Sequence, residues 1–274
     1  MLPRQASRPD RPGVFEHITS SSNTRLKSLR RWHTRSRRDR DNVVVVEGED
    51  LVSAAIDASC ALRFILVDAE RSEAIHGLLD RVDPSRVCSA SNELIASVSD
   101  LAHPPRVIGV FDRPAEPEHV PEGMARIVLD AVHDPGNVGT AIRSATALGA
   151  AVVLLPGCGD PWSGKALRAA MGATFRAVVM RSSSCAEACA GSDQIIALAA
   201  DADQPVWGIQ LDSSSAFIVG SERNGISDDS GAIATARAMI PFADAHSDSL
   251  NAGVAASLAL YEWSRQQSRE DENA

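Results

Sequence analysis

Short apolar runs alternate along this chain with longer segments whose composition favours helices. The runs lie at residues 43–47, 62–68, 86–90 and 106–114 in the first part of the chain, and at 126–132, 150–157, 176–180, 194–200 and 216–222 in the second. Apolar runs of this kind, bounded by turn residues, are typical of buried strands, and strands that alternate with helices form α/β sheets. The pattern therefore predicts two α/β units. A short strand near Ile240 and a long helix over about residues 250–266 close the second.

Residues 113–123 separate the two units. This stretch, RPAEPEHVPEG, holds three prolines among charged residues, a composition typical of a linker. We therefore expect a smaller N-terminal domain over residues 41–112 and a C-terminal domain over residues 124–274. Residues 1–40 are expected to form a basic, partly disordered arm, with a basic helix over residues 22–40.

The composition is that of an ordinary globular protein, with 44% hydrophobic and 23% charged residues among 274. No run approaches the ~20 apolar residues of a membrane-spanning helix, and the start of the chain lacks the apolar core of a signal peptide. We therefore expect a cytoplasmic protein without a membrane partner. The cysteines, at positions 60, 88, 158, 185 and 189, are not spaced as metal ligands, so reduced thiols and no metal are expected.

The net charge of −9 averages over unlike parts of the chain. Residues 1–40 hold eleven Lys and Arg against three acidic residues, a net charge of +8, and leave −17 for the rest. Such a basic stretch, with Trp32 and His33 among the arginines, could bind RNA phosphates and stack a base. The alternative is a solvated helical face. The candidate phosphate contacts in this stretch are Arg30, Arg31, Arg35, Arg37 and Arg38.

Three polar clusters follow predicted strands of the second unit. They are DPGNVGTAIRSA from residue 134, VGSERNGIS from residue 219, and IPF followed by DSLNAGVAASLALYE from residue 248. Each alone could be a turn or a helix cap. GNVG is not the GxGxxG pattern, so a dinucleotide-binding fingerprint is absent from the sequence.

In this order and spacing, the three clusters resemble the motifs of the SpoU/TrmH family of SPOUT RNA methyltransferases. The resemblance covers about residues 43–263, and the segment DPWSGKALRAAMGATFR at 160–176 is similar to rRNA-modifying members. It implies a C-terminal domain with a parallel sheet and a deep trefoil knot, an L30e-like N-terminal domain that binds RNA, S-adenosylmethionine as cofactor, and a homodimer whose active site is completed across the interface.

The resemblance also implies the site residues and the reaction, methyl transfer to a ribose 2′-hydroxyl. By position in the motifs, the catalytic candidates are Asn137, Arg143, Glu222, Ser249 and Asn251, and the cofactor-binding candidates are Leu198, Ala199, Ala200, Gly220, Ile240, Leu250 and Asn251. An arginine is a poor general base because its pKa lies above about 12, so Arg143 is expected to grip a phosphate and stabilise developing charge. Proton abstraction is left open. Asn137 would position the ribose or orient Arg143, and Glu222 would hold Arg143 or a ribose hydroxyl. Ser249 and Asn251 would orient the reacting hydroxyl, and Lys165 and Arg168 are candidate phosphate contacts.

Other functions remain as alternatives. The separate N-terminal domain and the KALRAAMG stretch favour ribosomal RNA of the 23S type over transfer RNA as the substrate. A non-catalytic RNA- or ribosome-binding protein could share the scaffold, and a flavodoxin-like small-molecule binder is a third interpretation. The methylated nucleotide, and a role in resistance to a ribosome-targeting antibiotic as against housekeeping, are not determined by the sequence.

Overall fold

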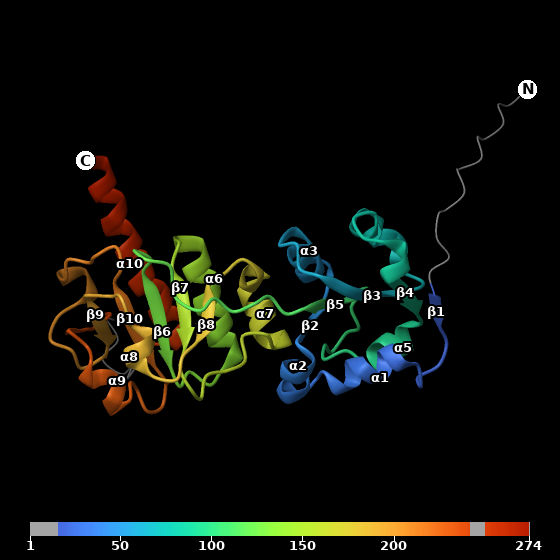
Figure 1. The fold of residues 1–274 in the computed structure, drawn as a ribbon, viewed down its shortest axis with the longest axis horizontal. Coiled ribbons are helices and arrows are strands. Elements are labelled where there is room, and N and C mark those ends of the chain that lie inside the picture. The colour runs from blue at the N-terminus through green and yellow to red at the C-terminus, as the bar shows by residue number, and fades with distance from the viewer. Residues whose placement is uncertain (1–15, 242–249, 274) are drawn as a thin grey trace, which may run out of the picture.

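The computed structural model describes residues 16–241 and 250–273, which form two α/β units that lie end to end (Figure 1). The first extends from β1 (Glu16–Ile18) to β5 (Val107–Asp112), and the second from β6 (Arg126–Asp130) to α10 (Ala252–Asn273). The predicted α/β class with a smaller first unit is confirmed. Residues 1–15 of the expected arm lie outside the described residues.

The N-terminal unit is built on a mixed sheet with helices on both faces. Between β1 and β5 come α1 (Thr24–Arg31), α2 (Arg35–Asp41), β2 (Val43–Glu47), α3 (Glu49–Asp57), β3 (Leu62–Asp68), α4 (His76–Leu79), β4 (Val87–Ala90) and α5 (Asn92–Ala96). The strand order is β1-β4-β3-β5-β2, in which β5 runs antiparallel to its neighbours β3 and β2. Side chains of β2 alternate between the two cores on either side of the sheet, as the period of a strand requires.

Residues 16–40 differ from the expected arm, because they are part of the N-terminal unit. β1 pairs with β4, and the expected single helix is two, α1 and α2. Leu26, Leu29 and Trp32, spaced three residues apart, put their side chains on one face of the helical segment and into the core. Helix α1 is therefore held by apolar packing, whereas α2 has no apolar residue and buries Arg38 instead. The other arginines of the two helices are exposed or half-buried.

The C-terminal unit has a sheet of six parallel strands in the order β11-β9-β10-β6-β7-β8. After β6 come α6 (Pro135–Leu148), β7 (Ala151–Leu154), α7 (Gly164–Ala170), β8 (Val179–Arg181), α8 (Cys185–Ala188), β9 (Ile195–Leu198), β10 (Ala216–Gly220), α9 (Asp228–Ala232) and β11 (Ala236–Ala238). The last strand lies a few residues earlier than the sequence predicts. Small side chains and a central Arg237 give β11 too little apolar character to be found by its pattern.

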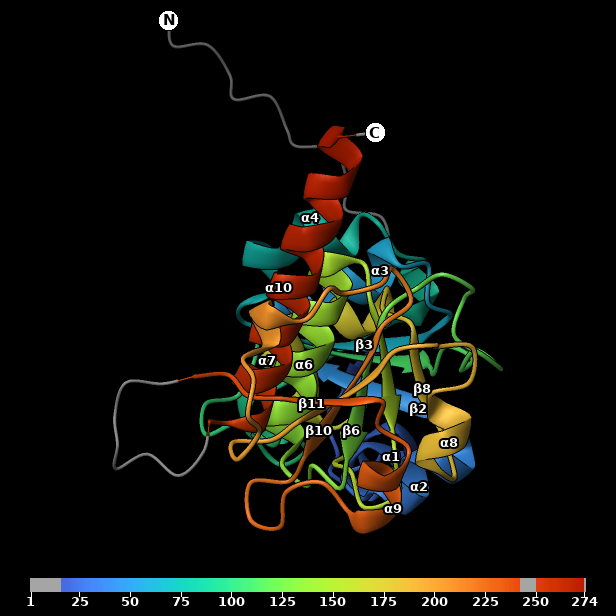
Figure 2. The ribbon, with the colours of Figure 1, turned by 90° about the vertical axis from the view of Figure 1, so that its left-hand side faces the viewer.

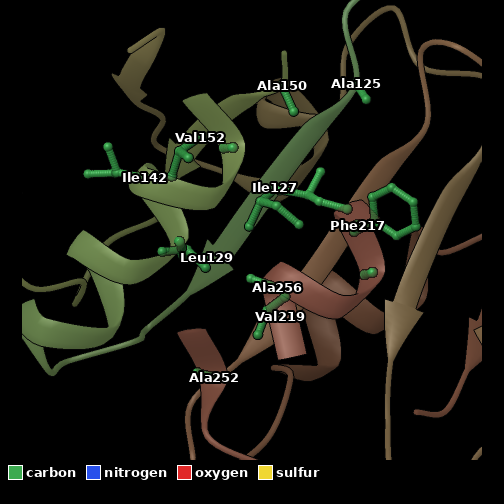
Figure 3. Packing of buried hydrophobic residues seen from close by; sticks show 14 of the residues in the cluster. Ala125, Ile127, Leu129, Ile142, Ala150, Val152, Phe217, Val219, Ala252 and Ala256 are labelled. Carbon is green, nitrogen blue, oxygen red and sulfur yellow. The ribbon is translucent and has the colours of Figure 1, made fainter. Parts of the chain in front are cut away.

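Both faces of this sheet are buried, as is usual for parallel strands. Ile127 and Leu129 of β6 face the core under α6 and α10 (Figure 3), whereas Val128 faces the opposite core with Cys185 of α8. The helix α10 runs along α6 (Figure 2). This packing ties the end of the chain to the helix that follows β6.

Within the described residues, no helix is long and apolar enough to cross a membrane, and no group of three or more His, Cys, Asp or Glu side chains could hold a metal ion.

Candidate active site

A pocket of about 660 Å³ opens at the carboxyl ends of β9 and β10. This is where open parallel sheets commonly bind their ligands. Of the predicted cofactor residues, the pocket is lined by Leu198, Ala199, Ala200, Gly220, Ile240 and Leu250. The structure thus brings together three segments that lie far apart in the sequence.

Gly220 ends β10 where the chain turns back on itself. Ser221 and Gly225 exchange two backbone hydrogen bonds of 3.0 and 2.9 Å, which folds the loop over the strand end. A Cβ atom at Gly220 would lie 2.1 Å from the carbonyl carbon of Gly225. Gly225 itself has φ +67°, which favours glycine. The pocket wall therefore requires glycine at both ends of this loop.

Charged side chains surround the pocket. Glu222 and Asp228 line it, and at its rim Arg237 donates a hydrogen bond of 2.6 Å to Asp201. Beneath the loop, the nearly buried carboxylate of Asp130 accepts hydrogen bonds from the backbone and hydroxyl of Ser227, at 2.8 and 2.7 Å. Asp130, Asp201 and Arg237 are not among the residues predicted from the sequence. An acidic residue at or shortly after the end of a buried strand was the available signal for Asp130 and Asp201.

A chain of amide hydrogen bonds joins the three motifs. Asn137, in the first turn of α6, donates through Nδ2 to the carboxylate of Glu222. Its Oδ1 accepts a hydrogen bond of 2.8 Å from Nδ2 of Asn251. Asn251 in turn accepts from the backbone N–H of Val254 at 3.2 Å, as a residue at a helix start does. Glu222, which was expected to hold Arg143 or a ribose hydroxyl, holds Asn137 in this structure.

The first turn of α6 is fixed by Asp134. Its carboxylate accepts from the backbone N–H of Gly136 at 2.6 Å and forms an ion pair of 2.8 Å with Lys165. The hydrogen bond from Lys165, followed by that from Gly136, holds the pKa of Asp134 below its usual value. Lys165, a predicted phosphate contact, therefore also supports the helix that presents Asn137.

Arg143 is exposed on α6 and is not part of this network. Among the residues that the structure describes, it has no hydrogen bond or ion pair, and it does not line the pocket of its own chain. Ser249 lies outside the described residues. Arg168, on α7, is half-buried.

The predicted RNA-binding arginines have different environments. Arg31 and Arg37 are exposed, Arg30 bonds the carbonyl of Ser21 and the hydroxyl of Ser97, and Arg35 lies 3.5 Å from a carboxylate oxygen of Asp39.

Two expectations about this basic stretch are wrong. Arg38 is 7% exposed and ion-paired with Asp160, so it cannot reach a phosphate. The Trp32 ring is buried and donates a hydrogen bond of 2.8 Å to Asp41, so it cannot stack a base. Trp32 faces inward because it continues the apolar stripe of α1, whereas Arg38 of α2 faces inward toward the carboxylate of Asp160.

Comparison with known proteins supports the assignment of the three motifs to an RNA methyltransferase family. Residues 124–261 match the SpoU rRNA Methylase family, and residues 23–109 match the MRM3-like substrate binding domain. The 23S rRNA (guanosine(2553)-2'-O)-methyltransferase RlmP of Bacillus subtilis is 30% identical over 252 residues, covering 90% of this chain and 98% of that protein.

Two solved structures are similar over nearly the same length. The SpoU methyltransferase AviRb from Streptomyces viridochromogenes, in complex with AdoMet, has a TM-score of 0.78 at 26% identity, covering 89% of this chain and 98% of that one. An AdoMet-bound rRNA methyltransferase from Sinorhizobium meliloti has a TM-score of 0.79 at 27% identity, covering 92% and 98%. The resemblance of the three motifs is thus confirmed, and the chain belongs to the SpoU rRNA methylase family.

Proposed function

We propose that this protein transfers a methyl group from S-adenosylmethionine to a ribose 2′-hydroxyl of 23S-type ribosomal RNA. The observation that carries the proposal is the pocket at β9 and β10, which gathers the predicted cofactor loops beside the chain of hydrogen bonds from Glu222 to Asn251. The AdoMet bound in two similar structures and the 23S rRNA substrate of RlmP support the same reaction.

The pocket fits S-adenosylmethionine. A volume of about 660 Å³ is ordinary for a small-molecule site, and Leu198, Ile240 and Leu250 offer apolar surface to an adenine ring. Gly220 lets the backbone of Gly225 and Ile226 pack against the end of β10, which forms one wall of the pocket. The carboxylates of Glu222 and Asp228 suit a ligand that carries positive charge.

Asn137 and Arg143 have different roles in the proposed reaction. When bound, the cofactor would supply a methyl group on a sulfonium: attack of the ribose oxygen on the methyl carbon would form the O–C bond and break the C–S bond, with a neutral thioether as leaving group. Asn137, with its amide fixed by Glu222 and Asn251, keeps one N–H and one lone pair with which to orient the ribose. Arg143 grips the neighbouring phosphate and stabilises charge on the reacting oxygen. Correct placement of the weakly nucleophilic hydroxyl is the main contribution.

The direct test is transfer of radiolabelled methyl from S-adenosylmethionine to 23S rRNA transcribed in vitro, with total tRNA as the competing substrate. Label in alkali-resistant dinucleotides from the 23S transcript is expected, because a 2′-O-methyl group blocks alkaline cleavage. Label in tRNA alone would contradict the assignment of 23S rRNA as the substrate. Binding of the cofactor without transfer to either RNA would contradict the proposed methyltransferase activity.

The RNA contacts the outer surface of α1 and α2. These helices lie on the same side of the molecule as α9, which follows the pocket loop (Figures 1 and 2). Arg31 and Arg37 are exposed there, and Lys165 and Arg168 extend the positive charge on the catalytic unit. RNA bound on this surface would extend from the N-terminal unit to the catalytic pocket, where its ribose reacts.

The double variant Arg31→Ala, Arg37→Ala is expected to weaken RNA binding and reduce its dependence on salt. Each lost phosphate contact lowers the slope of log K against log salt by about 0.7–0.9. Fluorescence anisotropy with a 23S fragment at several salt concentrations measures the slope. Arg86→Ala, a variant at an exposed arginine of the same unit, is the control and is expected to keep the wild-type slope. An unchanged slope in the double variant would contradict the proposed surface.

The working form is a homodimer that pairs through α10. Val254, Leu258 and Tyr261, spaced four and three residues apart, form an exposed apolar stripe with 43%, 41% and 61% of each residue exposed. Arg143 lies outside the pocket of its own chain, as a site completed by a second copy would require. An exposed stripe of this kind is typical of an interaction surface.

Leu258→Glu is expected to convert the dimer to a monomer, because it places a charge within the apolar stripe. Multi-angle light scattering gives the mass in solution, and calorimetry with S-adenosylmethionine tests that the pocket persists. Met171→Glu, which removes an exposed apolar side chain on α7's C-terminal end, is the control that stays dimeric. A wild-type monomer, or a dimeric Leu258→Glu protein, would contradict the interface.

Two further expectations remain predictions. One is the trefoil knot of the C-terminal domain, which the family resemblance implies, and the other is the cytoplasmic location expected from the sequence.

A further inference from the structure

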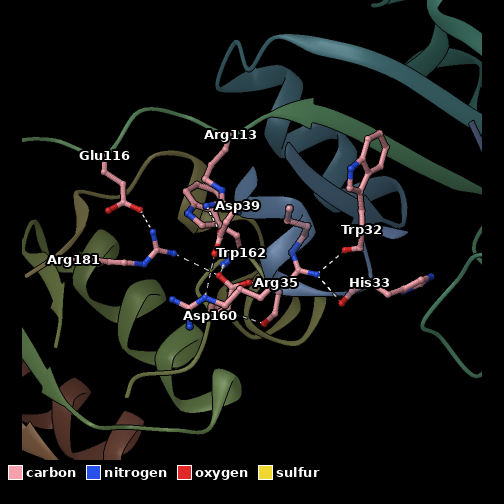
Figure 4. Close-up of polar contacts among 11 residues, drawn as sticks. Trp32, His33, Arg35, Asp39, Arg113, Glu116, Asp160, Trp162 and Arg181 are labelled. Atoms are coloured by element: carbon pink, nitrogen blue, oxygen red, sulfur yellow. Dashed lines mark hydrogen bonds and ion pairs between the residues drawn. The ribbon is translucent and has the colours of Figure 1, made fainter. Parts of the chain in front are cut away.

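The two units meet where α2 faces the segment between β7 and α7. Charged side chains from both units and from the linker converge there (Figure 4). The proposed reaction assigns no role to this junction. It contains three arginines whose guanidinium groups each have at least one buried nitrogen without a hydrogen-bond partner among the described residues: Arg38, Arg113 and Arg181.

The centre of the junction is the ion pair of Arg38 and Asp160. Nη2 of Arg38 donates to Oδ2 of Asp160 at 2.6 Å, and the two side chains are 9% and 6% exposed. The same guanidinium donates through Nη1 to the carbonyls of Trp32 and His33, at 2.7 and 2.9 Å. The Arg38 fork is thus fixed in the frame of the N-terminal unit.

Asp160 is fixed in the frame of the catalytic unit. Its Oδ1 accepts from the backbone N–H of Trp162 at 3.1 Å, and its carbonyl accepts from the hydroxyl of Ser163 at 2.9 Å. Separating Asp160 from Arg38 would break an ion pair between two nearly buried charges, which is costly because neither charge is well hydrated there. The pair therefore tolerates little movement of one unit against the other.

The linker is attached at the same place. Arg113 forms an ion pair of 2.7 Å with Asp39 of α2, and Glu116 is ion-paired with Arg181 of β8. Arg181 also lies 3.7 Å from Asp160. The start of the linker is consequently held to both units by charged groups.

Apolar packing continues across the junction. Trp162 packs on Phe175 with ring centroids 5.9 Å apart, and both belong to one core with Val52 of the N-terminal unit. A Cβ atom at Gly172 would lie 2.5 Å from that of Ala54 on α3. The surfaces are in close contact, and the ion pair sets their register.

The junction is linked to the reacting groups through α7. A Cβ atom at Gly139 of α6 would lie 2.3 Å from the carbonyl oxygen of Ala166, so the two helices touch at backbone level. Helix α6 carries Asn137 and Arg143. The contacts thus run from Arg38 through Asp160 and α7 to the catalytic helix.

We propose that Arg38 and Asp160 are positioning residues, whose buried ion pair fixes the RNA-binding unit relative to the site of methyl transfer. RNA bound on α1 and α2 then presents its ribose at the right place without a search over domain orientations. This inference rests on the proposed function for its kinetic consequence, whereas the fixed orientation itself does not depend on the reaction.

The test is Asp160→Asn in the full-length protein. Hydrogen exchange is expected to accelerate at least about tenfold in α2 and at residues 113–123, with the strands of both sheets unchanged. The KM for 23S transcript is expected to rise about tenfold with kcat reduced less than threefold. The Kd of S-adenosylmethionine is expected to stay within about twofold, since the pocket lies on the other half of the sheet. Asp57→Asn, which breaks the exposed ion pair with Arg81, is the matched control.

Arg38→Lys is the second variant. It is used if the backbone amides of the Asp160→Asn protein exchange rapidly throughout, which would mean that this variant is unfolded. Lysine keeps the charge but cannot bond both carbonyls and Asp160 in the fixed geometry of the fork, so a smaller change in the same direction is expected. Wild-type exchange at α2 and the linker in a folded variant, or a fall in kcat with KM unchanged, would overturn the proposal. If the wild-type protein methylates no RNA, the proposed function fails, and the exchange data still decide whether the ion pair fixes the orientation.

Discussion

Replacing Arg143 with alanine is expected to lower the rate of methyl transfer by about 10²–10³-fold, the usual effect of removing one donor that stabilises a developing oxyanion. Affinity for S-adenosylmethionine is expected to stay within about twofold, because Arg143 does not line the pocket of its own chain. Single-turnover transfer of labelled methyl to 23S transcript measures the rate, and calorimetry measures the affinity. The two readouts separate a group that acts on the RNA from one that holds the cofactor.

Two further variants make this result specific. Arg143→Lys keeps the charge without the planar fork and is expected to recover only a small part of the rate. Arg176→Ala removes another exposed arginine of the same unit and is expected to leave the rate unchanged. A large loss of cofactor affinity in Arg143→Ala, or a rate near that of the wild type, would contradict the assigned role.

The pocket loops could be predicted because the resemblance fixed their positions in the sequence. Gly220, Gly225 and the small residues Ala199 and Ala200 mark loops that follow strands, and the parallel sheet then brings these strand ends to one edge. The partners within the site were harder to predict. Glu222 was expected to hold Arg143 or a ribose hydroxyl, yet it accepts a hydrogen bond from Asn137, because only the fold brings together side chains that lie 85 positions apart.

The basic stretch shows why charge alone misleads. Its many arginines predicted a partly disordered RNA-binding arm with a basic helix over residues 22–40, but Leu26, Leu29 and Trp32 recur every three residues and were the available signal for packing. That stripe accounts for the packing of α1 but not for that of α2, which has no apolar residue. Arg38 could not be recognised as an exception, since its partner Asp160 is 122 positions away and follows no spacing rule.

Gly220→Val is expected to weaken binding of S-adenosylmethionine by about tenfold to a hundredfold, which corresponds to the ~1–3 kcal/mol that overpacking costs. The added Cβ atom would lie 2.1 Å from the carbonyl carbon of Gly225 and 2.3 Å from the backbone nitrogen of Ile226, so the loop that walls the pocket must move. Calorimetry measures the affinity. Gly77→Val, at an exposed glycine with no atom near its would-be Cβ, is the control that retains binding. Undiminished cofactor binding in Gly220→Val would show that the cofactor lies elsewhere.

Gly220→Val and Arg143→Ala together test whether each active site uses two chains. The assay uses S-adenosylmethionine at a concentration below its wild-type Kd, at which both variants are strongly impaired. When the two proteins are unfolded, mixed and refolded at equal concentration, half of the dimers contain one copy of each. In these, one site combines an intact pocket with the partner's intact arginine, so activity is expected to return to about a quarter of the wild-type level. No recovery would place Arg143 and the pocket of a single chain in the same site, and the dimer would then have no part in the chemistry.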